Sequence, residues 1–448
     1  MAAFDELDFY TDAAAIDDPY PFFAHWRAKG PVVELPHHGV VAITTYDETV
    51  EVLRDHERFS SCNAVTGPFP GFGARPEGDD VNDFIAAHRD ELPMSEYMVT
   101  QDPPLHEDQR GLIMRLFTPK RMRENEAFMW DLAAQMVEPA VRDGRVEVLR
   151  DYGRVFTTLV IAYLLGIPEA DRNAFRERLD GVGAARADPV RGGPGSEAVP
   201  LVHDPLEFLQ ARFRDYVEDR RAHPRGDVLS EMATATYRDG RVPEAEAVVR
   251  MGTFLFAAGQ DTSSRLIAMS LRIIAENPDI QHFLRDDPSR IGAFIEEVLR
   301  FESVVKSQAR TARVTTTVGG VKVEAGTQLG IFPGAANRDP ARFECPDEFR
   351  PDRENASAHL SFGRGVHACP GGPLARLETV VSVATFLSKT SHIAIDEERH
   401  GPADDRDFRF EPTYVLRGLR RLHLLLTPAA PDAVPPPAAR SNPRDFQS

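Results

Sequence analysis

The chain has 448 residues, and 52 Lys and Arg against 70 Asp and Glu give it a net charge of −18. This acidic balance excludes a protein that binds nucleic acid through a basic surface. A hydrophobic content of 42% with 27% charged residues excludes a disordered chain and predicts a large core.

The three cysteines, Cys62, Cys345 and Cys369, are too few and too scattered for a disulfide framework, and the sequence has no CxxC pattern for zinc. The acidic N-terminal segment lacks the basic and apolar parts of a signal peptide. A membrane-spanning helix needs about 18 consecutive apolar residues, and no such run occurs. We therefore expect a cytoplasmic protein that makes no membrane contact.

Taken in chain order, the predicted elements are mostly helical, with few strands. Two short β-rich runs around a glycine lie in 31–44, and long loops rich in glycine and proline follow at 66–80 and 188–205. An alternating pattern in 315–331, split by Gly319 and Gly320, predicts another pair of strands. The expected fold class is mainly α with small β-sheets.

The longest predicted helix runs from about Pro243 to Asn277, because proline suits a first helical turn and Pro278 closes the far end. Apolar residues cover nearly all its faces, which is typical of a helix inside a core. The segment from Gly259 to Ser264 interrupts this pattern with polar residues, at a cost in helix propensity. One interpretation is a kink, or two helices joined by a turn.

Residues 359–376, HLSFGRGVHACPGGPLAR, form the most informative segment. Its glycines allow tight turns and a close approach to a flat partner. Cys369 precedes a helical segment and has Arg364 and His367 nearby, a setting that favours the metal-binding thiolate. A cysteine-dependent hydrolase is disfavoured, because a cysteine and a histidine two residues apart on such a loop rarely meet as nucleophile and base.

The pattern Phe362-x-x-Gly365-x-x-x-Cys369-x-Gly371 resembles the haem-binding signature of the cytochrome P450 superfamily. Other segments resemble further motifs of that family in the family's order. They are 102–110 (the entry to its C helix), 258–262 (the oxygen groove of its long I helix), 297–300 (its ExxR motif) and 335–353. The resemblance covers about 19–427. It implies a cytochrome P450 fold in a single haem domain, 1–427, followed by a Pro-rich disordered tail, 428–448.

The resemblance implies haem b, iron protoporphyrin IX, held between the long helix and the cysteine loop. Cys369 is the implied axial ligand, whose thiolate favours O–O cleavage over reversible oxygen binding. Glu297, Arg300 and Arg353 are implied to form a structural ion-pair triad. The implied cofactor-binding residues are His106, Arg110, Ala258, Arg310, Phe362, Gly363, His367, Cys369 and Gly371.

A monooxygenase activity follows from the same resemblance. Thr262 is implied to donate a hydrogen bond to dioxygen and Asp261 to relay protons, so this pair is the expected catalytic pair. The expected substrate is a neutral hydrophobic small molecule, such as a terpenoid, steroid or fatty-acid-like compound. The residues expected around it are Phe72, Met98, Phe254, Ala257, Ala258, Val304, Val305, Val415 and Leu416.

The sequence has neither a flavin-binding segment nor a cysteine cluster for iron and sulfur, so we expect electrons from a separate ferredoxin and its NAD(P)H-dependent reductase. Pro370 removes a backbone N–H beside the sulfur. We expect a monomer, and the alternative function is a haem-binding protein or sensor without turnover. A basic docking face is expected from Arg115, Lys120, Arg121, Arg123, Arg350, Arg353, Arg364 and Arg376.

Overall fold

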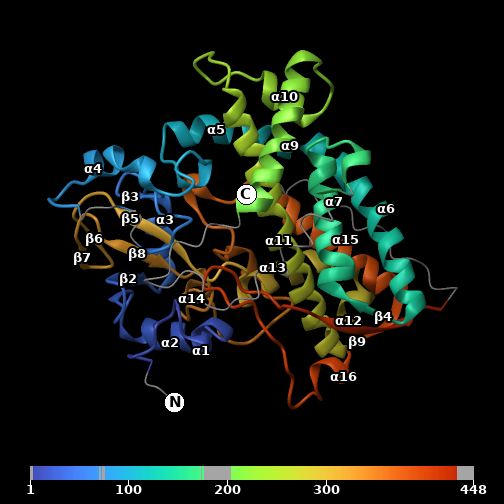
Figure 1. The fold of residues 1–448 in the computed structure, drawn as a ribbon. Coiled ribbons are helices and arrows are strands. Elements are labelled where there is room, and N and C mark those ends of the chain that lie inside the picture. Colours follow the sequence, from blue (N-terminus) through green and yellow to red (C-terminus); the bar gives the residue numbers. More distant parts are fainter. Residues whose placement is uncertain (1–3, 70–71, 73–75, 173, 176–202, 431–448) are drawn as a thin grey trace.

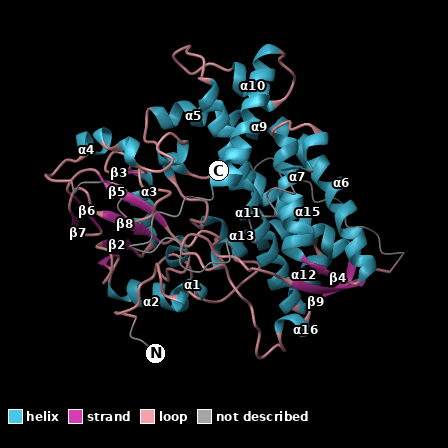
Figure 2. Cartoon of the chain, viewed as in Figure 1, coloured by secondary structure: helices cyan, strands magenta, loops and turns pink. Residues whose placement is uncertain are grey.

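The computed structural model describes residues 4–69, 72, 76–172, 174–175 and 203–430. Helices dominate, and the strands gather mainly at one side of the molecule, beside the N-terminal helices (Figures 1 and 2). The predicted class, mainly α with small β-sheets, is confirmed. Within the described ranges, no helix is long and apolar enough to cross a membrane.

The helices before the long central helix are α1 (Ala13–Asp17), α2 (Tyr20–Lys29), α3 (Tyr46–Arg54), α4 (Asn82–Ala87), α5 (Leu105–Ile113), α6 (Pro119–Asp143), α7 (Arg154–Leu164), α9 (His203–Ala222) and α10 (Val228–Thr234). The central helix and those after it are α11 (Ala245–Glu276), α12 (Pro278–Asp286), α13 (Ile291–Phe301), α14 (Pro333–Ala336), α15 (Gly372–Lys389) and α16 (Glu397–His400).

The strands form sheets of five, three and two members. They are β1 (Val32–Glu34), β2 (Val40–Ile43), β3 (Phe59–Ser60), β4 (Arg145–Glu147), β5 (Gln308–Ala312), β6 (Thr316–Val318), β7 (Val321–Val323), β8 (Gln328–Ile331), β9 (Thr390–Ile395) and β10 (His423–Pro428).

The five-stranded sheet has the order β1-β2-β8-β5-β3 and joins segments that are far apart in the sequence. The predicted runs in 31–44 form the antiparallel pair β1–β2, and β2 continues parallel to β8. The runs in 315–331 form the β6–β7 hairpin and β8. Gly319 and Gly320 make the hairpin turn with φ of +53° and +81°, a conformation that favours glycine.

The boundaries of two predicted irregular segments need correction. Pro428, assigned to the disordered tail, pairs with Thr390 as the last residue of β10, and residues 431–448 lie outside the described residues. The predicted loop 188–205 also lies outside them up to 202, but its last residues, 203–205, begin α9. Most of the loop at 66–80 is described, and these described residues form neither helix nor strand.

Helix α11 runs without interruption from Ala245 to Glu276, so the interpretation of two helices joined by a turn is wrong. In the polar middle of the helix, the hydroxyl groups of Thr262 and Ser264 form hydrogen bonds with backbone carbonyls of the same helix. Thr262 Oγ1 donates to the Ala258 carbonyl at 2.9 Å, and Ser264 Oγ donates to the Asp261 carbonyl at 2.9 Å. These local bonds offset part of the propensity cost. The helix crosses the core and packs on α7, α9 and α15.

Helix α15 carries a carboxyl group into this core. Glu378 is 1% exposed, and its side chain forms a hydrogen bond with the side chain of Ser263 on α11. No described residue pairs with its Oε2 atom. Burial disfavours the charged form and raises the pKa of Glu378 to about 8. The core therefore holds this side chain as a neutral acid at neutral pH.

This neutral acid makes stability depend on pH. The folded state keeps a proton that the unfolded state releases, so the free energy of unfolding decreases as the pH rises from the ordinary carboxyl value towards about 8. A Glu378→Gln variant keeps the neutral shape and should lose this decrease. We expect the variant to be more stable than the wild type at pH 8 and the gap to close near pH 5, as measured by denaturant unfolding.

The matched control is Glu398→Gln, which changes an exposed carboxyl on α16. It should keep the pH slope of the wild type. Equal pH slopes for Glu378→Gln and the wild type would contradict the assignment of a buried neutral acid.

Candidate active site

The cysteine loop is fixed on both sides of Cys369. The Cys369 N–H donates to the Phe362 carbonyl at 2.8 Å. Gly365, with φ of +74°, presses against α3 so closely that a Cβ atom there would lie 2.4 Å from the Leu53 carbonyl oxygen. Only glycine fits this contact, which holds the loop against α3.

The sulfur of Cys369 has backbone donors despite the proline beside it. The N–H groups of Gly371 and Gly372, at the start of α15, both donate to it. Its side chain remains accessible, although the surrounding protein desolvates the thiol and raises the pKa of Cys369. The sulfur therefore lies deep in the fold without being covered by packed side chains. Pro370 removes one N–H, but the next two residues supply the hydrogen bonds.

On α11, one face is exposed in the middle of an otherwise buried helix. Ala258 is exposed and Phe254, Ala257 and Thr262 are half-buried, whereas the helix is almost wholly buried from residue 263 to 275. Asp261 lies beside this face. Its Oδ2 accepts hydrogen bonds from Nε and Nη2 of Arg265, at 3.0 and 2.9 Å. The acid–alcohol pair thus borders a face of α11 that the protein does not cover.

Four cationic or basic side chains from three segments lie inside the protein with few acids to balance them. His106 and Arg110 share a face of α5, Arg310 comes from β5 and His367 from the cysteine loop. The rings of His106 and His367 lie 4.0 Å apart. Within the described ranges, both ring nitrogens of His106, Nη1 of Arg110 and Nε2 of His367 are buried without a hydrogen-bond partner.

The electrostatics of this basic cluster (His106, Arg110, Arg310 and His367) favour an anion. Burial, and then the charge of Arg110, lowers the pKa of His106 to about 4, while burial lowers the pKa of Arg310 to about 10. Asp102 is the acid that counters both. Its oxygens already accept bonds from Ser60 Oγ and the Ser61 N–H. Unpaired buried donors of this kind fit carboxylates such as the two haem propionates.

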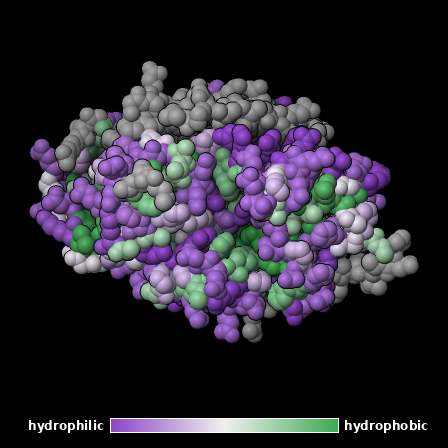
Figure 3. Space-filling view, turned by 90° about the horizontal axis from the view of Figure 1, so that it is seen from below, coloured by the Kyte–Doolittle hydropathy of each residue, from purple (hydrophilic) through white to green (hydrophobic). Residues whose placement is uncertain are grey.

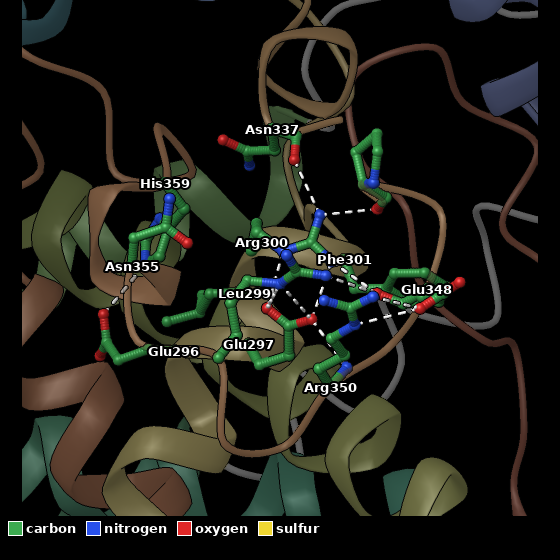
Figure 4. A network of polar contacts seen from close by, with 12 residues as sticks. Glu296, Glu297, Leu299, Arg300, Phe301, Asn337, Glu348, Arg350, Asn355 and His359 are labelled. Carbon is green, nitrogen blue, oxygen red and sulfur yellow. Dashed lines mark hydrogen bonds and ion pairs between the residues drawn. The ribbon is translucent and has the colours of Figure 1, made fainter. Parts of the chain in front are cut away.

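The triad predicted from the ExxR motif lies on the side of α13 that faces the segment before the cysteine loop (Figure 4). Glu297 and Arg300 are both 0% exposed, and Arg300 Nε and Nη2 donate to Glu297 at 2.7 and 2.8 Å. Arg353 Nε donates to both oxygens of Glu297 at 3.1 Å. The two guanidinium groups also donate to the carbonyls of Asn337, Glu344, Cys345, Pro346 and Glu348.

Two segments that carry residues expected around a substrate, 304–305 and 415–416, pair with each other. Val305 and Leu416 form an isolated β-bridge, beside which Arg417 N–H donates to the Val304 carbonyl and Lys306 N–H to that of Val415. Phe72 packs against Phe84, with ring centroids 5.2 Å apart, in a small hydrophobic cluster. Its contact with a substrate stays a prediction. Met98 is buried in a one-turn 3-10 helix, Met98–Thr100.

Several of the basic residues expected on a docking face are already paired. Arg353 belongs to the triad, and Arg376 forms an ion pair with Glu296 at 2.5 Å while its guanidinium lies over the Phe362 ring. Arg121 pairs with Glu231, and Arg350 with Glu348. Some exposed basic residues form no ion pair with a described residue, among them Arg115, Arg123 and also Arg54, beside Gly365. The predicted basic face is therefore smaller than expected.

Sequence reasoning missed several polar contacts around this site, because each joins distant segments. Examples are the hydrogen bonds of His359 and Arg376 to Glu296, and that of Gln210 to Tyr97. The Arg265 bond to Asp261 was missed as well, although the spacing of four residues on a helix could have indicated it.

Comparison with known proteins places the chain in a family. The sequence profile described as cytochrome P450 matches residues 196–412. Cytochrome P450 144 of Mycobacterium tuberculosis is 33% identical over 85% of this chain and 85% of its own length. The chain belongs to the cytochrome P450 family. It is therefore a haem-binding monooxygenase, an oxidoreductase whose cofactor is haem b, with the iron that this cofactor carries.

Two further relatives of this cytochrome P450 extend over nearly the whole chain. The substrate-free structure of Mycobacterium marinum cytochrome P450 CYP150A6 has a TM-score of 0.88 and 49% identity, covering 96% of this chain and all of that one. Erythromycin C-12 hydroxylase of Saccharopolyspora erythraea is 29% identical over 95% of this chain and 98% of its own length. The predicted P450 fold is thereby confirmed.

The triad generates a prediction on stability and haem content. Glu297→Ala removes the acceptor of two buried guanidinium groups, which costs about 3–5 kcal/mol because it strands buried charge. The purified variant should bind haem poorly, as measured by the ratio of Soret to protein absorbance. The control Glu348→Ala removes an exposed carboxylate paired with Arg350 and should leave haem content unchanged. Normal haem content in Glu297→Ala would contradict the role of the triad.

Proposed function

We propose that this cytochrome P450 inserts one atom of dioxygen into a neutral hydrophobic small molecule, with electrons from a separate ferredoxin. The observation that carries the proposal is the uncovered face of α11. Phe254, Ala257 and Ala258 lie there beside Asp261 and Thr262, on a helix that packs on α15, the helix that follows the cysteine loop. An apolar surface next to an acid–alcohol pair suits oxidation of a hydrocarbon.

The residues that hold the cofactor follow from the geometry of the donors. Cys369 would ligate the iron, and the N–H groups of Gly371 and Gly372 donate to its sulfur. His106, Arg110, Arg310 and His367 would bind the propionates, because buried nitrogens of the two histidines and of Arg110 have no described partner and Arg310 is buried with them. Phe362 packs beside the loop, Gly363 turns it with φ of +69°, and the small side chain of Ala258 would leave room for the cofactor.

The haem supplies the activation of dioxygen, and this chain's own residues supply the protons. Thr262 Oγ1 donates to the Ala258 carbonyl, so its own lone pairs can accept a hydrogen bond from a water. Rotation of the hydroxyl lets the same group donate to dioxygen. The Asp261 carboxylate accepts hydrogen bonds from Arg265. The proposed proton route is a movement of this side chain between Arg265 and solvent, in which the carboxylate carries the proton. This pair supports a turnover enzyme over a haem-based sensor.

The proposed substrate class is supported by the apolar side chains and by one relative. Phe254, Val304, Val305 and Leu416 carry no charge. One relative is named erythromycin C-12 hydroxylase, and its name states hydroxylation of erythromycin. We propose hydroxylation of a comparable hydrophobic compound here, of the terpenoid, steroid or fatty-acid-like kind. We also propose a single haem domain, because the site draws on segments from His106 to Leu416.

The proposed electron donor is an acidic ferredoxin that docks near the cysteine loop. Arg54 ends α3, its Cα atom lies 2.9 Å from where a Gly365 Cβ would be, and its side chain is exposed. Arg115 and Arg123 are further exposed cations on the segments that follow α5. A local positive face attracts an acidic partner even when the whole chain is acidic. Figure 3 shows one face of the molecule, on which hydrophilic residues predominate.

The proton pair generates a prediction on coupling. Thr262→Ala removes the hydroxyl that positions water and dioxygen, so more of the NAD(P)H consumed should end as hydrogen peroxide and less as product. The measurement is peroxide formed per NAD(P)H in the reconstituted system. Thr262→Ser restores the hydroxyl and should recover most of the coupling. Wild-type coupling in Thr262→Ala would rule out this role.

The docking face generates a prediction on rates. Arg54→Glu should slow reduction by ferredoxin several-fold at low ionic strength, and the difference should vanish at high salt because screening removes it. Stopped-flow reduction of the carbon monoxide complex measures the rate. Lys322→Glu reverses a charge that is 66% exposed on the β6–β7 hairpin and should have no effect. Equal salt dependence in Arg54→Glu and wild type would exclude docking here.

A further inference from the structure

A polar pair lies at the far end of the uncovered face of α11. Tyr97, just before the turn Met98–Thr100, is 8% exposed. Its hydroxyl oxygen lies 2.7 Å from Nε2 of Gln210, on α9. The two residues are 113 apart in the sequence, so the fold brings them together. Neither belongs to the residues already proposed to hold the haem or move protons.

The hydrogen-bonding groups of this pair are not all used. The Gln210 amide N–H donates to the Tyr97 oxygen, so the Tyr97 hydroxyl proton and the Gln210 amide oxygen have no described partner. Reversing the amide would make Tyr97 the donor, and one donor and one acceptor would still remain. The pair therefore offers both a donor and an acceptor to a further group.

The pair is placed relative to the reaction by α11. The Tyr97 ring contacts Phe254 edge to face, with centroids 6.0 Å apart. Phe254, Ala258 and Thr262 follow one another at intervals of four, so they share one face of the helix. The helical rise puts Phe254 about 12 Å along the axis from Thr262. A molecule on this face can thus reach Thr262 with one end and the polar pair with the other.

Charge near the pair favours a neutral group over an ionic one. Arg250, one turn before Phe254, forms an ion pair with Glu96 at 3.0 Å. Glu96 directly precedes Tyr97, so the nearest positive charge is already matched by a negative one. A hydroxyl or carbonyl gains a hydrogen bond from Tyr97 or Gln210 without meeting an unbalanced charge.

We propose that Tyr97 and Gln210 form a subsite for a hydroxyl or carbonyl group of the substrate, at the end remote from the oxidised carbon. The inference rests on the proposed function and narrows it. The substrate has a hydrocarbon body with one neutral hydrogen-bonding group, rather than being a plain hydrocarbon or a carboxylate. Tyr97 and Gln210 then determine specificity, because a substrate without that group leaves them unpaired.

The test uses probes that bind the haem of the holoenzyme whatever the natural substrate is. N-alkylimidazoles place an imidazole nitrogen on the iron and extend their chain into the substrate space. A series with chains shorter than, equal to and longer than the about 12 Å helical rise is prepared with methyl, hydroxyl or carboxylate ends. Dissociation constants come from the red shift of the Soret band.

For each chain length, the dissociation constant of the methyl-ended probe is divided by that of the hydroxyl-ended probe. At one chain length this ratio should be about tenfold larger than at shorter lengths, as expected for one added hydrogen bond. Tyr97→Phe should abolish this gain and leave the affinity for methyl-ended probes unchanged. Gln210→Leu should reduce the gain. Tyr163→Phe, on an exposed tyrosine of α7, is the matched control and should keep it.

Two outcomes would overturn the subsite. They are a hydroxyl effect that does not depend on chain length or persists in Tyr97→Phe, and a carboxylate end that binds more tightly than the hydroxyl end. Failure of the proposed function looks different, because the reconstituted system would then form no hydroxylated product although imidazole would still shift the Soret band to the red.

Discussion

The active site depends on the hydrogen bonds that the carboxylate of Glu297 accepts. This carboxylate has no exposed surface and accepts hydrogen bonds from Arg300, from Arg353 and from the Arg350 N–H at 2.9 Å. Both arginines also bind backbone carbonyls between residues 337 and 348. One acid thus fixes a segment without regular structure against α13. Its buried charge costs solvation, so its role is to position this segment rather than to add stability.

The fixed segment leads directly into the cysteine loop. Asn337 donates to Ser303 and Ser361 Oγ, at 2.8 and 2.9 Å, and its side-chain oxygen accepts the Leu360 N–H at 2.7 Å. Gly365 then presses on α3. The position of Cys369 relative to α11 follows from this chain of contacts. The basic cluster of His106, Arg110, Arg310 and His367 offers hydrogen-bond donors that would bind the propionates of the cofactor.

Much of this site could be predicted because its signals are local in sequence. The spacing around Cys369, the Glu297–Arg300 pair three residues apart and the His106–Arg110 pair four apart each lie within one turn or one loop. The continuity of α11 was less predictable. Propensity disfavours the polar middle, but hydroxyl bonds to carbonyls and packing on three helices outweigh that cost.

Contacts between distant segments could not be predicted in the same way. Glu378 meets Ser263, and Tyr97 meets Gln210, only because α11, α15 and α9 pack together. The contact of Phe72 with Phe84 is another example. The place of Phe72 in a loop between motifs suggested a substrate contact, which stays a prediction. An apolar residue in a sequence does not indicate what it packs against, whereas a cysteine among glycines indicates a specific function.

The central claim is that Cys369, held by this network, presents a thiolate to the haem iron. Its most direct measurement is the absorbance spectrum of the reduced carbon monoxide complex, in the wild type and in Cys369→His. The wild type should show the strongly red-shifted Soret band of thiolate-ligated haem, and Cys369→His should show the band of imidazole-ligated haem. A thiolate-type band in Cys369→His would mean that Cys62 or Cys345 ligates the iron, and the account would be wrong.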